Sequence, residues 1–465
     1  MDLLSLREHY ARTLLIHYRW DVAKVFEVYG NEGKDCLYKD ACVMVHDDGD
    51  ISSMPSTSAI LCEICMEEVP FYKTTTMDCG HCFCNDCWRE HFVVKINEGQ
   101  GRRISCMAYK CDVICDEDKI RNSIRELDPA LAKKFDQYLL ESYIEDNKRV
   151  KWCPSVPHCG NAIRIENDDE LCEVECVCGV QFCFSCSSEA HSPCSCEMWE
   201  LWTMKNKDES ETVNWLIANT RNCPKCLKPA EKNGGCNLVR CICKQAYCWK
   251  CGGATGTRHT WDSIEGHTCG RFMEDYLANK EHRRAKHWRY MHYYNHYKAH
   301  TDSLAAELSL KGKLQEKISK LTTAQPEIKD YTWVTNGANR LFRSRRLLSY
   351  SYPFAYYMFN DTFLSKEMTE ENRTIKRNLF EDKQQQLEGN IEKLSHFLEK
   401  LFDEDSKDEV MESRQKIVTL SKITNVLCKN LYDCIDNDIL LHLTTIINIA
   451  PYKSKGLDKA VELRQ

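Results

Sequence analysis

The sequence has no apolar run that approaches the length of a membrane span, and it has no excess of basic residues. Its net charge is −7, whereas a protein whose main role is to bind nucleic acid usually carries a stripe of basic residues. The first residues, MDLLSLREHYARTLL, carry charges throughout and lack the apolar core of a signal peptide. These absences argue against membrane, secreted and nucleic-acid-binding classes, and we expect a cytoplasmic or nuclear location.

Glycine and proline are sparse after residue 270, where segments such as EENRTIKRNLFEDKQQQLEGNIEKLSHFLEKLF combine helical periodicity with mixed charge. Because few residues there break helices, we expect residues 271–465 to form an antiparallel helical bundle. Residues 46–59, HDDGDISSMPSTSA, are polar and contain glycine and proline. They are predicted to be a linker.

Residues 3–45, before that linker, are predicted to be a small helical module. Four apolar side chains recur there at helical spacing, namely Leu6, Tyr10, Leu14 and Tyr18. A second helical stretch is expected to start at Trp20-Asp21, and Gly30 is its predicted stop.

Cysteine is abundant, with 30 residues, of which 26 lie between Cys62 and Cys269 inclusive. Without a signal peptide the chain is expected in a reducing compartment, where thiols bind metal rather than pair as disulfides. Many of these cysteines form CxxC and CxC pairs, and two such pairs can close a tetrahedral zinc site. Cysteine-rich modules this small bury little core, so zinc would supply their folding energy.

The first cluster, in residues 60–112, offers eight ligands in four pairs. They are Cys62, Cys65, Cys79, His81, Cys84, Cys87, Cys106 and Cys111. If pairs one and three share one zinc and pairs two and four another, the loops interleave and lock together. Cys82 and Cys115 are surplus and are expected to be small buried side chains.

The second cluster, in residues 150–197, also offers eight ligands. They are Cys153, Cys159, Cys176, Cys178, Cys183, Cys186, His191 and Cys196, with Cys194 as a rival for the last position. Residues 113–149 are predicted to be connecting helices, one of which begins at Asp128-Pro129. Residues 198–219 are polar and acidic and are predicted to be a partly helical linker.

The third cluster, in residues 220–270, contains one thiol too many. Its predicted ligands are Cys223, Cys226, Cys241, Cys243, Cys248, Cys251, His259 and Cys269, with His267 as a rival for His259. Cys236, in the turn Gly-Gly-Cys-Asn, is left over. With 24 ligands and four for each metal, the three clusters predict about six zinc ions.

Three consecutive double-zinc clusters, with a free cysteine in the third, resemble the RING, in-between-RING and second RING-like modules of RING-between-RING ubiquitin ligases. The phrases CEICMEE, CGHCFCNDCW, KWCP, QFCFSC, NCPKC, NGGCN and YCWKCGG carry this resemblance. The region from about residue 271 resembles the Ariadne domain, residues 3–45 resemble the UBA-like module of Ariadne ligases, and HSPCSCEMWELW and GGATGTRHTW resemble a plant member. The implied fold is multidomain and mostly α, with small zinc-stabilised α+β modules.

The resemblance implies a relay of ubiquitin. The first RING would recruit a ubiquitin-charged conjugating enzyme, with Ile64 and Trp88 in the docking surface, although both side chains could instead only pack the RING core. Ubiquitin would pass to Cys236 as a thioester, which requires a thiolate, and then to substrate lysines. The alternative for Cys236 is an unpaired thiol or a swapped zinc ligand.

One departure from the family concerns the residue two positions after the nucleophile. Family members commonly have a histidine there that removes a proton from the attacking amine, but here the residue is Leu238. Leucine cannot accept a proton, so discharge would be slow or would use His259 or His267 if either is free of zinc. The other interpretation is a catalytically weak zinc scaffold or adaptor that recruits the ubiquitin machinery.

The resemblance also implies that residues 271–465 hold the catalytic module inactive until neddylated cullin ligases bind the UBA-like module. Glu307 and Glu399 are expected to make the inhibitory contact, and the alternative is that they are solvated charges on helix surfaces. Ala306 occupies the position where an aromatic residue is expected, so the inhibitory contact could be weaker. The implied partners are the conjugating enzyme, ubiquitin, substrates and neddylated cullin ligases, without membranes or nucleic acid.

Overall fold

The computed structural model forms two compact units. The first contains residues 1–168, 176–178 and 460–465, and the second contains residues 169–175 and 179–459. The residues that the structure describes are 6–45, 59–125, 128–165, 172–208, 221–230, 237–250, 252–254, 282–324, 330–360, 367–401, 407–441, 443–459 and 461–462.

The N-terminal part of the first unit is helical, as its apolar spacing predicts. Its helices are α1 (Glu8–His17), α2 (Val22–Glu32) and α3 (Lys34–Asp40). The predicted stripe of Leu6, Tyr10, Leu14 and Tyr18 is buried in one small core. Asp21 caps α2, because its carboxylate accepts a hydrogen bond from the Lys24 backbone N–H at 3.0 Å. The prediction that α2 stops at Gly30 is wrong, since the helix ends at Gly33, whose φ of 87° favours glycine.

The first cysteine cluster lies on two short hairpins and a helix. The elements are β1 (Ala59–Leu61), β2 (Glu68–Pro70), η1 (Phe71–Lys73), β3 (Thr74–Thr76), β4 (Cys82–Cys84) and α4 (Asn85–Asn97), with β1 paired to β2 and β3 to β4. Two further helices, α5 (Glu117–Arg125) and α6 (Pro129–Asp146), pack against α4. The predicted start at Asp128 is confirmed, because its carboxylate caps α6 and Pro129 is the first helical residue.

Two small three-stranded sheets carry the second cysteine cluster. In the first unit, β6 (Ala162–Arg164) lies between β5 (Val150–Trp152) and β14 (Val461–Glu462). In the second unit, β7 (Glu173–Glu175) lies between β8 (Gln181–Cys183) and β13 (Asp458–Lys459), and β13 runs parallel to β7. Each sheet is therefore completed by a strand from residues 458–462.

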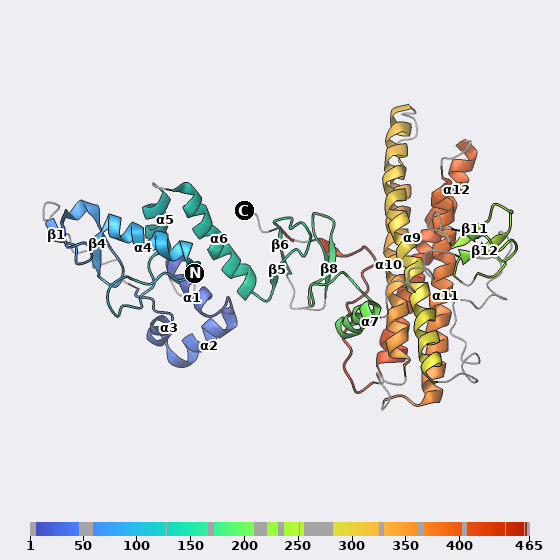
Figure 1. Cartoon of the computed structure of the whole chain (residues 1–465), viewed down its shortest axis with the longest axis horizontal. Helices are drawn as coiled ribbons and strands as arrows, with labels where there is room; N and C mark the ends of the chain where they lie inside the picture. Colours follow the sequence, from blue (N-terminus) through green and yellow to red (C-terminus); the bar gives the residue numbers. More distant parts are fainter. Residues whose placement is uncertain are drawn as a thin grey trace. The chain divides into compact units, whose positions relative to one another are not determined.

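Four long helices form the core of the second unit (Figure 1). They are α9 (His282–Ala324), α10 (Thr332–Met358), α11 (Glu370–Lys400) and α12 (Lys407–Asp433), which a π-helical segment, Cys434–Leu440, extends. Helix α7 (Cys196–Asp208) packs on this bundle through Trp199 and Trp202. The segment predicted as a linker from residue 198 is therefore helical as far as Asp208. Among the described residues, no helix is both long and apolar enough to traverse a bilayer.

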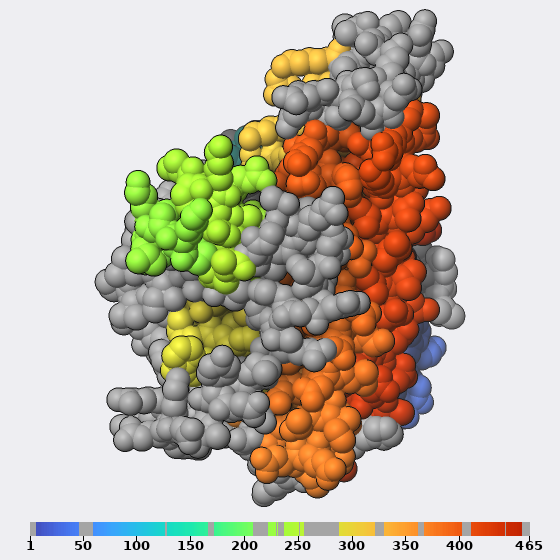
Figure 2. Space-filling view, turned by 90° about the vertical axis from the view of Figure 1, so that its right-hand side faces the viewer, coloured from blue at the N-terminus to red at the C-terminus, as the bar shows by residue number. Residues whose placement is uncertain are grey.

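The third cysteine cluster forms a small module of two hairpins in the second unit. Its strands are β9 (Arg221–Asn222), β10 (Pro229–Ala230), β11 (Leu238–Arg240) and β12 (Ala246–Cys248), with β9 paired to β10 and β11 to β12. Figure 2 shows this module, in green, lying against the orange and red helices of the bundle. The bundle thus supports the segment that contains the predicted nucleophile.

Candidate functional site

The first cluster gathers its eight ligands into two groups, in the interleaved pairing that the sequence predicts. Cys62, Cys65, Cys84 and Cys87 form one group, and Cys79, His81, Cys106 and Cys111 form the other. The Cys62 and Cys87 sulfurs are 4.0 Å apart, and those of Cys65 and Cys84 are 3.9 Å apart. Four thiolates at about 2.3 Å from a tetrahedral zinc lie about 3.8 Å from one another. The geometry therefore fits zinc.

The second cluster also forms two groups of four. Cys153, Cys159, Cys176 and Cys178 form one, and Cys183, Cys186, His191 and Cys196 form the other. Sulfur separations of 3.7 Å between Cys183 and Cys196 and 3.8 Å between Cys159 and Cys176 again match a tetrahedral zinc.

The structure decides between Cys194 and Cys196 as the last ligand of this cluster. The Cys196 sulfur joins the ligand group, whereas the Cys194 thiol is buried and donates a hydrogen bond to the Tyr350 carbonyl at 3.3 Å. Burial raises the pKa of the Cys194 thiol well above its usual range, so this sulfur stays protonated. The Cys194 carbonyl lies 2.9 Å from Nδ1 of His191, which leaves Nε2 of that ring for the metal.

A fifth group joins two pairs of the third cluster, namely Cys223, Cys226, Cys241 and Cys243. Sulfur separations of 3.6 Å between Cys223 and Cys243 and 3.5 Å between Cys226 and Cys241 are close to the zinc value. Cys248, predicted for the sixth group, is buried in β12. The other residues discussed for this module lie outside the described residues, namely Cys236, Cys251, His259, His267 and Cys269.

The two residues predicted to dock a conjugating enzyme differ in exposure. Ile64 lies between two zinc ligands and is 49% exposed, so its side chain is accessible to a partner. Trp88 has no exposed surface, donates a hydrogen bond to the Thr75 carbonyl at 2.8 Å and stacks on Phe92. The expectation of direct docking by Trp88 is corrected, because this side chain forms the RING core.

The residue next to Cys236 is held by the helical bundle. Both the backbone N–H and the side-chain amide of Asn237 donate to the Glu392 carboxylate on α11, at 2.7 and 2.9 Å. Asn237 and Glu392 are both fully buried. Leu238 follows on β11 and pairs with Cys248 on β12. Leu238, at the position where family members commonly have a histidine, is thus the first residue of a two-stranded hairpin.

The Glu392 carboxylate belongs to a buried ionic cluster inside the bundle. Arg345 on α10 contacts Glu392 and donates to Glu307 on α9 at 2.7 and 3.0 Å, while the Ser395 hydroxyl donates to Glu307 at 3.1 Å. Burial disfavours the charge on Arg345, but the two carboxylates outweigh it and raise the pKa of Arg345. Arg345 therefore stays charged and fixes Glu392 beneath Asn237.

A second contact, an ion pair, joins the module of the third cysteine cluster to the bundle. Lys250 follows β12, is almost completely buried, and forms an ion pair with Glu388 on α11. The hydroxyl of Tyr352 donates to the other Glu388 oxygen at 3.0 Å. Glu388 and Glu392 are one helical turn apart, so a single face of α11 holds the module at both Asn237 and Lys250.

The predicted inhibitory residues lie near this face but have other contacts. Glu307 is buried and binds Arg345, so it is not a solvated surface charge. Glu399 lies two turns beyond Glu392 on α11 and accepts a hydrogen bond from Ser395 at 3.3 Å. Among the described residues, the carboxylate that reaches Asn237 is Glu392. Sequence reasoning missed Glu388 and Glu392, although they recur at helical spacing on the same α11 face as Glu399.

Comparison with known proteins decides the family. The model of the Ariadne domain matches residues 288–465, and that of the IBR domain, a half RING-finger domain, matches residues 133–196 and 203–260. Probable E3 ubiquitin-protein ligase ARI1 of Arabidopsis thaliana is 59% identical over 99% of this chain and 78% of its own length. The chain belongs to the Ariadne family of RING-between-RING ubiquitin ligases.

Other Ariadne relatives are more distant but still extend over most of the chain. E3 ubiquitin-protein ligase ariadne-1 of Drosophila melanogaster is 32% identical and covers 94% of this chain and 85% of its own length. ARIH1 of Bos taurus is 32% identical over 87% of this chain and 71% of its own length. The likeness to the plant protein is much closer, which agrees with the plant member predicted from the sequence.

Proposed function

We propose that this Ariadne chain receives ubiquitin from a conjugating enzyme as a thioester on Cys236 and transfers it to substrate lysines. The observation that carries the proposal is that Cys223, Cys226, Cys241 and Cys243 form a complete metal site without the intervening Cys236. If Cys248, Cys251, His259 and Cys269 complete the sixth group as predicted, the Cys236 sulfur is left without a metal and can act as a nucleophile.

The transfer has two steps that each exchange one acyl bond. The Cys236 thiolate attacks the carbonyl carbon of the conjugating enzyme's thioester, the new C–S bond forms, and the enzyme's own thiolate leaves. A neutral lysine amine then attacks the Cys236 thioester, an amide forms, and the Cys236 thiolate leaves. The ammonium of the incoming lysine must first lose a proton.

The second step distinguishes this proposal from its alternative. Leu238 cannot accept the amine proton, so we propose that His259 or His267 does so if it is free of zinc. The same leucine favours the alternative of a zinc scaffold that recruits ubiquitin machinery with weak catalysis. Formation of a thioester on Cys236 separates the two functions, because a scaffold would not form one.

The thioester test uses two cysteine variants. The wild-type chain, mixed with a ubiquitin-charged conjugating enzyme, is expected to form a ubiquitin adduct that a thiol reductant cleaves. Cys236→Ala is expected to abolish this adduct, whereas Cys82→Ala should retain it, because Cys82 lies outside the two ligand groups of the first cluster. An unchanged adduct with Cys236→Ala would overturn the relay.

We further propose that each of the three cysteine clusters binds two zinc ions, about six in all. The zinc ions would fix the loops that present Ile64 and the turn before Asn237, and they have no part in the acyl transfer. The first RING would present the exposed Ile64 to the conjugating enzyme, while the buried Trp88 would hold the shape of that surface.

We propose that the bundle inhibits the chain by holding Asn237 and Lys250 on α11. Glu392→Ala removes the carboxylate under Asn237 and is expected to raise Cys236 loading about tenfold, because a coupling of this kind is worth about 1–3 kcal/mol. Neddylated cullin, bound to the UBA-like module, is expected to accelerate the wild-type chain more than this variant. The measurement is the initial rate of thioester formation.

The matched control for this prediction lies on the same helix. Glu399→Ala removes the same charge two turns away and should change the loading rate less than Glu392→Ala does. A slower or unchanged Glu392→Ala variant, or a larger effect at Glu399, would show that the contact at Asn237 does not restrain the nucleophile.

A further inference from the structure

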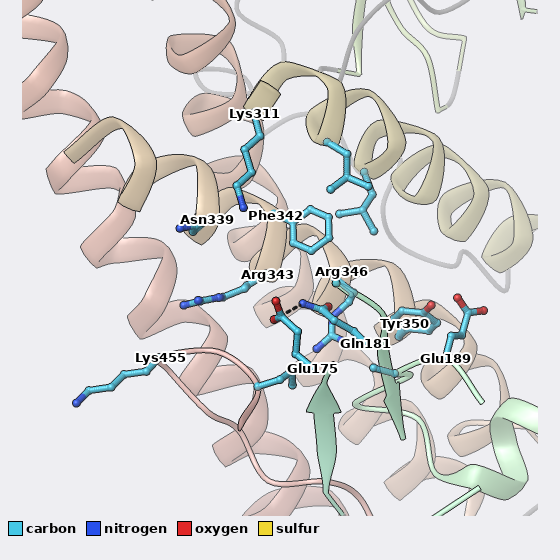
Figure 3. A pocket seen from close by; sticks show the side chains of 15 residues that line it. Glu175, Gln181, Glu189, Lys311, Asn339, Phe342, Arg343, Arg346, Tyr350 and Lys455 are labelled. Carbon is cyan, nitrogen blue, oxygen red and sulfur yellow. Dashed lines mark hydrogen bonds between the residues drawn. The ribbon is translucent and has the colours of Figure 1, made fainter. Parts of the chain in front are cut away.

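A cavity of about 790 Å³ lies in the second unit, away from the catalytic module. Its walls come from the second sheet near β7 and β8, from α9 and α10, and from the segment before β13 (Figure 3). None of the lining residues belongs to the five metal groups described above or to the contacts of Asn237 and Lys250. The proposed ubiquitin relay makes no use of this cavity.

Three cationic side chains line one side of the cavity. Lys311 comes from α9, Arg343 from α10 and Lys455 from the segment before β13. Figure 3 shows them on the same side, with the amine of Lys455 pointing away from the other two. Glu189 lies at the opposite end. Because three separate elements supply the cations, the cluster depends on the tertiary fold rather than on a local charge run.

Arg343 is the least exposed of the three cations, and the Glu175 carboxylate acts on its charge only through space. Its guanidinium packs against the backbone of Gly456, where an added Cβ would lie 2.5 Å from the Arg343 Cζ atom. Arg343 is half-buried and makes no hydrogen bond or ion pair within the part of the chain that the structure describes. Burial and the neighbouring Arg340 lower the pKa of Arg343. A partly desolvated guanidinium in this position is stabilised by an anion.

The charge of the cavity lining indicates how much negative charge that anion carries. Arg346 also lines it but is neutralised by an ion pair of 3.0 Å with Glu173. At the end where they lie, Lys311, Arg343 and Lys455 stand against the Glu175 carboxylate, which leaves about two positive charges there. Glu189, at the opposite end, reduces the net charge of the whole lining to about +1. A phosphate monoester carries a charge of about −1.5 to −2 at neutral pH, whereas a carboxylate carries only one.

The remaining walls indicate what bears the phosphate. Leu304, Leu308 and Phe342 provide an apolar surface beside the cations, and Leu308 is 52% exposed. Glu175 and Glu189 would repel a chain of successive phosphates, which argues against a nucleic acid. We propose that this cavity binds a peptide through one phosphoserine or phosphothreonine, with the phosphate on Lys311 and Arg343, the charge of Lys455 on the same side, and an adjacent apolar side chain on Leu308.

The test is a direct binding measurement on the full zinc-loaded chain, without ubiquitin transfer, so it is independent of the proposed relay. The probe is a pentapeptide in which leucines flank a phosphoserine, titrated calorimetrically. The comparison ligands are the serine peptide, the glutamate peptide and inorganic phosphate. The phosphopeptide is expected to bind about tenfold more tightly than each of them, because a charged hydrogen bond contributes about 1.5–3 kcal/mol.

Substitutions of single residues test whether the phosphopeptide binds in this cavity. Arg343→Ala and Lys311→Ala should each weaken phosphopeptide binding about tenfold or more, while Lys320→Ala, an exposed charge on the same helix as Lys311, should leave it unchanged. Lys311 is exposed, so its variant tests the site even if the Arg343 variant does not fold. Equal binding of the phosphorylated and plain peptides, or equal binding by the Lys311→Ala and Lys320→Ala variants, overturns the proposal. Inorganic phosphate binding as tightly as the phosphopeptide would overturn the peptide assignment.

Discussion

Replacing Arg345 with methionine is expected to destabilise the helical bundle by about 3–5 kcal/mol, because it leaves two carboxylates buried without their cation. Glu307 and Glu392 both lie on this guanidinium, and Arg345 has no exposed surface. A loss of that size is a large share of the 5–15 kcal/mol that typically separates folded from unfolded domains. Burial already raises the pKa of Glu307, so removing the cation would drive that carboxyl toward its neutral form.

Amide hydrogen exchange along α10 and α11 of the intact chain measures this effect without assuming that all modules unfold together. The control is Arg414→Met, because Arg414 is partly exposed and its ion pair with the exposed Asp330, at 3.9 Å, contributes little to stability. Adding Glu307→Gln and Glu392→Gln to Arg345→Met should restore part of the protection, since no charge is then left unpaired. Unchanged exchange in the Arg345 single variant would show that the cluster is not held in a low-dielectric interior.

Cys84→Ala is expected to unfold the first RING and to release both of its zinc ions, because the two sites interleave. Cys84 supplies one of four ligands, its sulfur accepts a hydrogen bond from the Cys87 backbone N–H at 3.4 Å, and it forms the N-cap of α4. Structural zinc contributes about 10–16 kcal/mol in small zinc-finger peptides, more than a RING core of this size can replace. Binding of the conjugating enzyme should be lost with the fold.

Cys82→Ala provides the matched control, since Cys82 lies on the same strand, two residues away, but outside the metal group. Elemental analysis is expected to find about six zinc ions in the wild-type chain and in Cys82→Ala, and about two fewer in Cys84→Ala. Amide hydrogen exchange along α4 reports whether the RING core survives. Full zinc content and unchanged exchange in Cys84→Ala would contradict the ligand assignment.

The metal groups could be predicted from the sequence because each consists of two short local pairs. Spacings such as Cys62-x2-Cys65 fix a pair of ligands within one turn of chain, so only the choice of partner pairs depends on the fold. Cys194 and Cys196 could not be separated in this way, because both follow His191 within five residues. The deciding facts are tertiary, since the Cys194 thiol bonds to Tyr350 in the bundle.

The contact between the bundle and Asn237 could not be placed from the sequence alone. Glu392 and Glu399 are seven residues apart, about two helical turns, so helical periodicity puts them on the same face of α11. Which of them meets the module of the third cysteine cluster depends on where along α11 that module lies, and the amphipathic pattern of the helix does not encode this position.

The role of Trp88 could not be decided from the sequence either. An aromatic side chain that follows a zinc ligand suits a docking surface as well as a core, and only the packing of Trp88 on Phe92 distinguishes the two.

The strands β13 and β14 also affect how the chain folds while it is being synthesised. Strand β6 leaves the ribosome about 300 residues before β14, which takes roughly 15–60 s at 5–20 residues per second. Until then the sheets of β6 and β7 each lack one strand. The middle of the polypeptide therefore emerges with unpaired strand edges, which are open to wrong pairing. Its maturation depends on residues translated long afterwards.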